Sequence, residues 1–350
     1  MLTRKFILAI SFPWLIQSGS LAANTSELSP TPAKSIFELL NYQEILEVDL
    51  AFDIKNLIAD RHSEKATKAV FAFRDQDNNL RKWDIKVSMR GNYRRTHCTA
   101  MPPLRLDFKK KELSAHGLSE FDDMKLVTQC IKDEAVAKKI LLKEYLAYKI
   151  YHQITEKSFR VQLLKINYTD IQSGRTSIEY GFLIEDTAEM RARIGAKKTD
   201  AAFYISPHRL DRAQFKTVAL FQYMIGNIDW KISPVRNLKL VEINGKVVVI
   251  PYDFDFSELV AAPYRTGSKK LNVVRKGDRA FLGFKEDLDD MEATTQLFKQ
   301  HKKSIIEIVQ HFKVLDREER NGLKDYIDSF YDGLSDIQVP PVDIHASYRE

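Results

Sequence analysis

Acidic and amide side chains flank two apolar runs in the second half of the chain. Asp229 and Asn237 precede the run LKLVEI, and Asp253 and Asp255 follow the run KVVVIPY. A carboxylate beside a valine-rich strand is costly to desolvate unless a cation pairs with it. The sequence therefore predicts a cationic partner for these residues, which can be either a basic side chain or a metal ion.

The elements around these residues follow a definite order. Residues 211–226 have helical periodicity, with Asp211 as a good N-cap and Gly226 as a good C-terminal stop. The dipeptide Asn244-Gly245 is a strong signal for a tight β-hairpin, so the runs on either side are predicted to pair as antiparallel strands. Phosphotransferases of the protein-kinase type build their metal site in the same order.

This order assigns a chemical role to each residue. Asp229 would orient or deprotonate an acceptor, while Asn237 and Asp253 would hold Mg²⁺ or Mn²⁺. Asp255 is a second candidate metal ligand, and Asp253 is preferred because it directly follows the strand. Mg²⁺ keeps several waters, so few protein ligands are enough. The plainer alternatives are that Asp229 pairs with Arg236 and that the two later aspartates accept backbone hydrogen bonds.

A kinase-type site also needs a lysine on an early strand and a glutamate on the next helix that holds it. Lys125, in the run MKLV, and Glu144, in the helical segment 134–155, are the natural pair. Lys109 is a second candidate and Arg105 a weaker third. An ordinary ion pair between Lys125 and Glu144 is the alternative interpretation.

Several short motifs connect these residues to a known family. The chain contains, in this order, RGNYRR, PPLRLDFKK, KEYLAYKIY, YGFLIED, GNIDW with RN, and PYDFDFS. In these motifs residues 85–260 resemble the CotH spore-coat kinase family and, more distantly, the HipA-type kinases. The resemblance implies an α+β fold of the two-lobe protein-kinase type, with an antiparallel β-rich N-terminal half and a mainly helical C-terminal half. It also implies ATP and a divalent cation as cofactors.

The same resemblance assigns residues by motif position. Asp229 matches the catalytic aspartate, Asn237 the metal-binding asparagine, and Asp253 the metal-binding aspartate before the activation segment. Glu185 falls at the hinge between the lobes and is expected to contact the cofactor. Arg90, in the turn RGN, is a candidate phosphate contact, because no other turn in that region offers one.

The sequence also departs from the kinase pattern. Asp229 and Asn237 are eight positions apart, whereas the usual kinase loop places four residues between them. Pro234 lies inside this insertion. The chain has neither a glycine-rich phosphate loop nor a P-loop motif.

The remaining periodicity predicts the organisation of the chain. Alternating apolar and polar residues between 45 and 127 favour antiparallel strands, and the segments near 286–302, 303–313 and 316–333 favour helices. We expect a signal peptide (1–23), a linker (24–40), a β-rich N-lobe-like region with one long helix (41–183), a C-lobe-like catalytic region (184–335) and a tail (336–350).

The amino terminus favours export. Arg4 and Lys5 precede an apolar run that ends before the small residues SLAA, which is the pattern of a cleaved signal peptide. We therefore expect a periplasmic or secreted protein without a transmembrane segment in the mature chain. The two cysteines, Cys98 and Cys130, favour a disulfide in such a compartment, although two buried thiols are the alternative.

These observations limit the function classes. The formal charge of +6 is mild for 350 residues and no long basic block occurs, so nucleic acid is not an expected partner. The leading interpretation is an exported CotH-like kinase that binds a nucleotide and transfers phosphate to a protein or surface acceptor. A catalytically inactive envelope binding or scaffold protein on the same fold is the alternative. Transfer of the nucleotide itself is a third, weaker class.

Overall fold

The computed structural model describes residues 33–60, 65–91, 97–200, 205, 207–265, 267–268 and 277–337. The expected signal peptide, the first part of the expected linker and nearly all of the expected tail lie outside these residues. Those predictions therefore stay predictions. Asn92 of the RGN turn also lies outside them.

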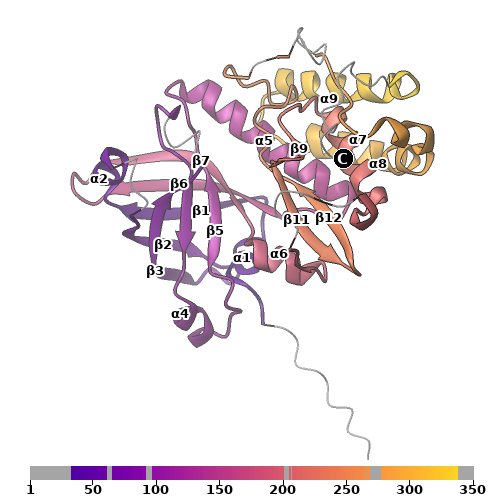
Figure 1. The fold of residues 1–350 in the computed structure, drawn as a ribbon. Coiled ribbons are helices and arrows are strands. Elements are labelled where there is room, and N and C mark those ends of the chain that lie inside the picture. Colours follow the sequence, from indigo (N-terminus) through magenta and orange to yellow (C-terminus); the bar gives the residue numbers. More distant parts are fainter. Residues whose placement is uncertain are drawn as a thin grey trace, which may run out of the picture. The chain divides into compact units, whose positions relative to one another are not determined.

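Seven strands of the described chain close into a β-barrel (Figure 1). Their order is β1-β2-β3-β4-β5-β7-β6, and every neighbouring pair is antiparallel except β1 and β6, which run parallel. The antiparallel pairing agrees with the sequence pattern, but the parallel pair that closes the barrel was not predicted. The strands are β1 (Ile45–Phe52), β2 (Thr67–Arg74), β3 (Leu80–Met89), β4 (Leu104–Asp107), β5 (Asp123–Val127), β6 (Val161–Asp170) and β7 (Thr176–Ile184).

Alternating side chains fill the barrel interior. Along β3 the residues Trp83, Ile85 and Val87 are buried, while the residues between them face outward. The Trp83 and Phe71 rings both lie edge-on to Phe108, with ring centroids 6.0 and 5.8 Å away. Each such fully buried ring contributes roughly 1.5–3 kcal/mol to folding. The barrel is therefore a packed scaffold on which neighbouring elements are mounted.

The last residues of the expected linker form helix α1 (Ile36–Leu40). Ser35 and Glu38 form a capping box, in which each side chain accepts a hydrogen bond from the other residue's backbone N–H. Ile36 and Phe37 are fully buried in the barrel cluster. The sequence did not predict this short helix, because the segment before it is polar and contains proline.

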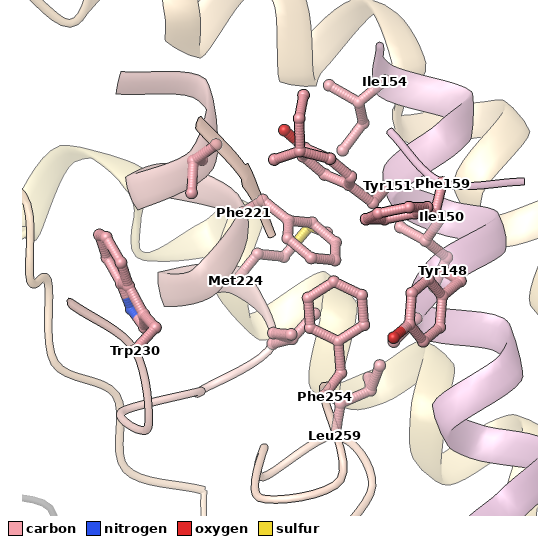
Figure 2. Close-up of a cluster of buried hydrophobic side chains, with 14 of the residues drawn as sticks. Tyr148, Ile150, Tyr151, Ile154, Phe159, Phe221, Met224, Trp230, Phe254 and Leu259 are labelled. Carbon is pink, nitrogen blue, oxygen red and sulfur yellow. The ribbon is translucent and has the colours of Figure 1, made fainter. Parts of the chain in front are cut away.

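Helix α5 (Glu134–Ile154) confirms the predicted long helix and begins at the N-cap Asp133. It was expected to belong to the β-rich half, yet its buried face packs mainly into the C-terminal core. Figure 2 shows Tyr148 and Tyr151 from α5 facing Phe221 and Phe254. The ring centroids of Tyr148 and Phe254 are 4.6 Å apart, as are those of Tyr151 and Phe221. The helix thus joins the barrel region to the C-terminal elements.

The C-terminal region surrounds a short sheet with helices. Asn244 and Gly245 both have positive φ (51° and 76°), which confirms the predicted tight hairpin between β11 and β12. The two helices expected at 286–302 and 303–313 are one helix, α8, because no glycine or proline interrupts its apolar face. The elements of this region are α6 (Thr187–Arg193), β8 (Lys197–Lys198), α7 (Arg212–Met224), β9 (Lys231–Ile232), β10 (Val235–Arg236), β11 (Leu238–Ile243), β12 (Lys246–Pro251), α8 (Glu292–His311) and α9 (Arg317–Asp332). It also contains 3₁₀ segments at Pro207–Arg209, Lys285–Asp290 and Leu334–Asp336. The small helices α2 (Ile54–Ala59) and α4 (Lys110–Ala115) lie beside the barrel strands.

The predicted disulfide is confirmed between Cys98 and Cys130. The backbone N–H groups of Thr99 and Ala100 also donate to the Cys130 carbonyl, at 2.9 and 3.2 Å. These contacts tie the segment that follows β3 to the loop that leads into α5. Among the described residues no helix combines the length and apolar character needed to cross a bilayer.

Gly226 ends α7 with a φ of +64°, and a Cβ placed there would meet the Tyr326 hydroxyl and lie 2.7 Å from the Glu258 Cβ. We expect Gly226→Ala to lower the free energy of unfolding by roughly 2–4 kcal/mol, since backbone strain and overpacking add. Gly195 is the matched control, because it follows α6 with a φ of +65° but has open space around its Cα. Denaturant unfolding should give Gly195→Ala only the backbone part, about 1 kcal/mol. Equal losses in both variants would contradict the packing argument.

Candidate nucleotide and metal site

One cavity of about 770 Å³ brings together most of the residues predicted from the sequence. Arg90, Glu144, Asp229, Asn237, Asp253 and Asp255 all line it, although they come from five separate segments. Lys125 and Glu185 are not among the lining residues. The other lining residues are Gly91, Pro103, Val127, Tyr148, Ile184, Ile228, Arg236, Tyr252, Phe256, Gly267 and Ser268.

The loop after α7 is held by a buried asparagine. Asn227 is fully buried, and its Nδ2 donates to Gln222 Oε1 at 3.0 Å. Its Oδ1 accepts from the backbone N–H of Asp229 at 3.0 Å, which forms an Asx-turn. Because Asn227 is anchored to α7, the backbone of Asp229 has a fixed position at the cavity.

The insertion between Asp229 and Asn237 folds into a small hairpin, in which β9 and β10 pair antiparallel. The hairpin returns Asn237 to the aspartate, so that Asn237 Nδ2 donates to the Asp229 carbonyl at 2.7 Å and to its Oδ2 at 3.0 Å. Asn237 has a φ of +52°, which asparagine tolerates better than most residues. The eight-residue spacing that departs from the kinase pattern therefore does not separate the two residues.

Asp229 also forms the ion pair that was weighed as the plainer alternative. Arg236 Nη1 donates to Asp229 Oδ1 at 2.8 Å, and the arginine side chain is 59% exposed. Both carboxylate oxygens of Asp229 thus have side-chain partners, Arg236 on one and Asn237 on the other. This contact does not exclude a role in catalysis, because an exposed ion pair of this kind is worth only about 1 kcal/mol or less.

Asp253 and Asp255 flank a buried aromatic anchor. Phe254 is fully buried, with its ring centroid 4.6 Å from that of Tyr148 and 5.4 Å from that of Phe221 (Figure 2). Asp253 has a φ of +66°, and its backbone N–H donates to the Tyr148 hydroxyl at 2.8 Å. Asp255 is 2% exposed and accepts a hydrogen bond from Tyr264 at 3.0 Å. Backbone strain of this kind at a non-glycine residue is typical of functional sites.

Lys125 and Glu144 do not form an ion pair in the described structure, so their expected functional pairing stays a prediction. Glu144 is 1% exposed and lines the cavity, but among the described residues no ion pair within 4 Å joins it to Lys125. The Lys125 ammonium instead lies over the rings of Phe159 and Tyr252, 5.4 and 5.7 Å from their centroids. The sequence pattern placed Lys125 on a strand and Glu144 on a helix, as observed, but it could not reveal that Lys125 lies over two aromatic rings.

Lys239, on β11, is a cationic residue that the sequence did not single out. Its ammonium lies 5.5 Å from the centroid of the Tyr252 ring. Burial, and then the nearby charges of Arg90 and Lys239, lower the pKa of Lys125 to about 8. Burial and then Arg90 also lower the pKa of Lys239. We call Arg90, Lys125 and Lys239 the cation cluster.

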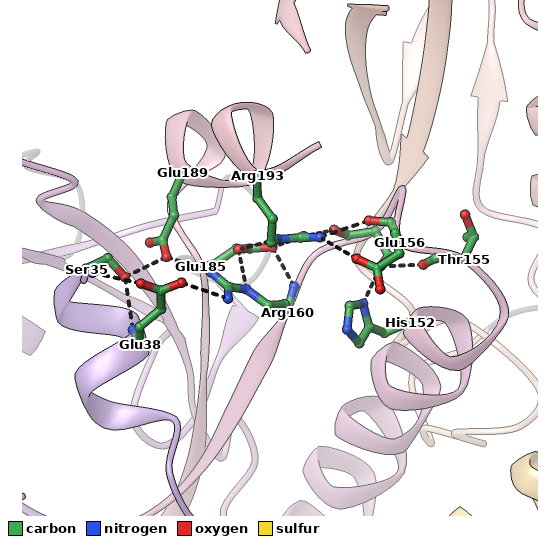
Figure 3. Close-up of polar contacts among 10 residues, drawn as sticks. Ser35, Glu38, His152, Thr155, Glu156, Arg160, Glu185, Glu189 and Arg193 are labelled. Atoms are coloured by element: carbon green, nitrogen blue, oxygen red, sulfur yellow. Dashed lines mark hydrogen bonds and ion pairs between the residues drawn. The ribbon is translucent and has the colours of Figure 1, made fainter. Parts of the chain in front are cut away.

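Glu185 is part of a buried ion-pair network (Figure 3). It is not among the residues that line the cavity, and its expected cofactor contact stays a prediction. It is fully buried, and it accepts from Arg160 Nε at 2.9 Å and from Arg193 Nη2 at 2.5 Å. Only the neighbouring Ile184 reaches the cavity. The two arginines bind both oxygens of the Glu185 carboxylate, so this residue links β7 to α6 and to the loop before β6.

The donor atoms at the cavity can be compared with the ligands that a divalent cation prefers. Carboxylate and amide oxygens are the ligands that Mg²⁺ prefers, and Asn237 with Asp253 supplies both. Among the described residues no group of three or more His, Cys, Asp or Glu side chains is already arranged around a common point. Because Mg²⁺ keeps several waters and needs few protein ligands, the donor set fits this ion without such a group.

Comparisons with known proteins add little to this geometry. No protein-family model and no curated protein sequence matches the chain. Among solved structures, the chain is similar to HipA of Shewanella oneidensis MR-1, from the toxin–antitoxin complex of HipA, HipB and operator DNA. The identity is 10% and the TM-score 0.32, over 63% of this chain and 59% of that chain, which is less than two thirds of its length. A similarity of this size assigns no role to any residue.

Glu189, in the same network as Glu185, is expected to make stability depend on pH. Its Oε1 accepts from Ser35 and Arg160 at 2.6 and 2.7 Å, whereas its buried Oε2 has no hydrogen-bond partner among the described residues. Burial raises the pKa of Glu189 to about 7, although those two contacts oppose the shift. The folded state therefore holds a proton that the unfolded state releases between about pH 4.5 and 7.

It follows that stability falls as the pH rises through this window, by on the order of 1–3 kcal/mol, and then levels off. Glu189→Gln should remove this component, which can be measured by urea unfolding at pH 5, 6, 7 and 8. Glu156→Gln is the control, because the Glu156 side chain is 87% exposed and belongs to the same network through its ion pair with Arg193. Parallel pH profiles for wild type and Glu189→Gln would contradict the assignment.

Proposed function

We propose that the chain is an exported, CotH-like phosphotransferase that transfers phosphate from ATP to a protein or surface acceptor. The observation that carries this proposal is the meeting of Asp229, Asn237 and Asp253 at one cavity, despite the insertion between the first two. The Cys98–Cys130 disulfide supports an oxidising compartment. Export itself rests on the amino-terminal sequence.

Each residue has a task that follows from its contacts. Asn237 and Asp253 would hold the cation, with Asp255 behind them, since it is buried and bonded to Tyr264. A bound cation and nucleotide would supply the phosphoryl group and neutralise its charge. Asp229 would position an acceptor hydroxyl and take up its proton, because its backbone is fixed by Asn227.

The proposal predicts nucleotide binding that depends on the metal ligands. ATP with Mg²⁺ or Mn²⁺ should raise the melting temperature of the mature protein, and Asp253→Asn should abolish this shift. Asp229→Asn should keep the shift but lose transfer of label from γ-labelled ATP, since it removes the proton acceptor and leaves the cation ligands. Asp84→Asn, on the barrel surface with a side chain that is 72% exposed, is the matched control. Absence of any nucleotide shift with either metal would overturn the proposal, and intact-mass analysis of the products would distinguish phosphate transfer from nucleotide transfer.

A second candidate is a catalytically inactive envelope scaffold on the same framework. The observation that favours it is that Arg236 and Asn237 occupy both carboxylate oxygens of Asp229. A further argument for the scaffold is that a compartment outside the cytoplasm is not expected to supply ATP.

Arg236→Gln separates the two candidates. In the phosphotransferase it frees one oxygen of Asp229, so label transfer should change severalfold, while the loss of stability stays at about 1 kcal/mol or less because the arginine is exposed. In the scaffold the same variant should change neither nucleotide-dependent melting nor label transfer. Label-transfer rates and melting curves measured on the same preparation decide between them.

A further inference from the structure

A second hollow of the molecule, which we call the α5–α8 cleft, has a volume of about 600 Å³. It is lined by the loop before β1, by α5, by β6 and by the end of α8. On α5 it takes Tyr145, Lys149 and Gln153, which follow one another at intervals of four residues, whereas Glu144 and Tyr148 line the candidate cavity. Residues four apart share one face of a helix, so the two hollows adjoin different faces of α5.

Tyr145 brings a hydroxyl without a protein partner to this cleft. The residue is 4% exposed, and its ring centroid lies 5.7 Å from that of Phe312, which also lines the cleft. Among the described residues, none makes a hydrogen bond with the Tyr145 hydroxyl. Burial and then the charge of Glu44, another lining residue, raise the pKa of Tyr145, so the hydroxyl lies near Glu44. Because buried polar groups are nearly always hydrogen-bonded, a ligand in the cleft would supply the missing partner.

Two further groups of the cleft have unused hydrogen-bonding capacity. Gln162 is 1% exposed, and its Nε2 donates to the backbone carbonyls of Gln43 and Leu163, both at 2.9 Å. These bonds fix the amide, whereas its Oε1 accepts no hydrogen bond from the described residues. The half-buried Lys149 makes neither a hydrogen bond nor an ion pair within the described chain. The cleft therefore offers a fixed acceptor and a donor beside the Tyr145 hydroxyl.

The lining favours an uncharged ligand that carries many hydroxyl groups. Glu44 and Glu307 stand against Lys149, so the cleft has no excess of positive charge for a phosphate. The rings of Tyr42 and Phe312 supply apolar surface on which the C–H face of a pyranose can pack. A volume of about 600 Å³ lies within the usual range for small-molecule sites. Like a sugar hydroxyl, an amide side chain both donates and accepts, and four amides line the cleft: Asn41, Gln43, Gln153 and Gln162.

We propose that the α5–α8 cleft binds a neutral oligosaccharide, with the Tyr145 hydroxyl, the Gln162 Oε1 and the Lys149 ammonium as its polar contacts. Such a site would hold the protein on a polysaccharide-bearing surface and leave the candidate cavity accessible, because the two hollows share no lining residue among those described. The inference does not rest on the proposed function, since no residue assigned to phosphate transfer takes part in it.

The test is a ligand-observed NMR titration of the full-length protein with the neutral trisaccharides chitotriose, cellotriose and maltotriose. At least one of them should bind saturably, with a Kd on the order of 1 mM or lower. Tyr145→Phe should weaken this binding about three- to tenfold, which is the loss expected for one hydrogen bond between uncharged groups. Its melting temperature should not fall, because the hydroxyl has no protein partner among the described residues. Lys149→Met, at a half-buried position, is a second variant that should weaken binding severalfold.

Tyr180→Phe is the matched control, because Tyr180 is a half-buried tyrosine on β7 that does not line the cleft. This variant should bind the sugar as the wild type does. The inference would be overturned if none of the three sugars binds saturably, if Tyr145→Phe and Tyr180→Phe weaken binding equally, or if acetylated and amidated tetra-alanine binds as tightly as the best sugar. Sugar binding that depends on Tyr145 in a protein that transfers no phosphate would remove the proposed function but leave this site in place.

Discussion

The burial of Phe254 between Tyr148 and Phe221 is the interaction on which the candidate site depends. The ring fixes the residues on either side of it, so Asp253 and Asp255 are directed by the packing of a neutral neighbour. Tyr148 contributes twice, because its ring packs on Phe254 and its hydroxyl accepts the backbone N–H of Asp253. Apolar side chains of α5 and α7 thus fix the positions of Asp253 and Asp255, two like charges that would not bring each other into place.

Two kinds of buried charge occur in the molecule, and they differ in how they are compensated. Glu185 is enclosed by Arg160 and Arg193 in a network with several hydrogen bonds, which is what a structural ion pair requires. The lysines of the cation cluster form no ion pair within 4 Å among the described residues, although the charges of Asp123 and Asp186 act on Lys125. Incompletely compensated charges occur more often at functional sites than in structural ion pairs.

The sequence was informative where local chemistry decides the structure. The capped helix that ends at Gly226 and the Asn244-Gly245 hairpin were both predicted, because caps and tight turns depend on a few adjacent residues. Asp229, Asn237 and Asp253 could be assigned to one site because their elements follow directly along the chain. Barrel closure by β1 and β6 could not be predicted, since their pairing joins residues more than a hundred positions apart.

The same distinction explains which site residues the sequence assigned wrongly or missed. The motif pattern places Glu185 at the hinge between the expected lobes, yet only the fold shows that Arg160 and Arg193 enclose it. The sequence did not single out Lys239, and only the fold shows that its ammonium lies near the ring of Tyr252 on the return strand. The insertion after Asp229 lengthens the chain between the aspartate and Asn237, but the hairpin of residues 231–236 takes up this length and keeps the two side chains in contact. A spacing rule measures length along the chain, but the chemistry depends on where a turn returns the chain, so an insertion that closes on itself leaves the geometry of the site unchanged.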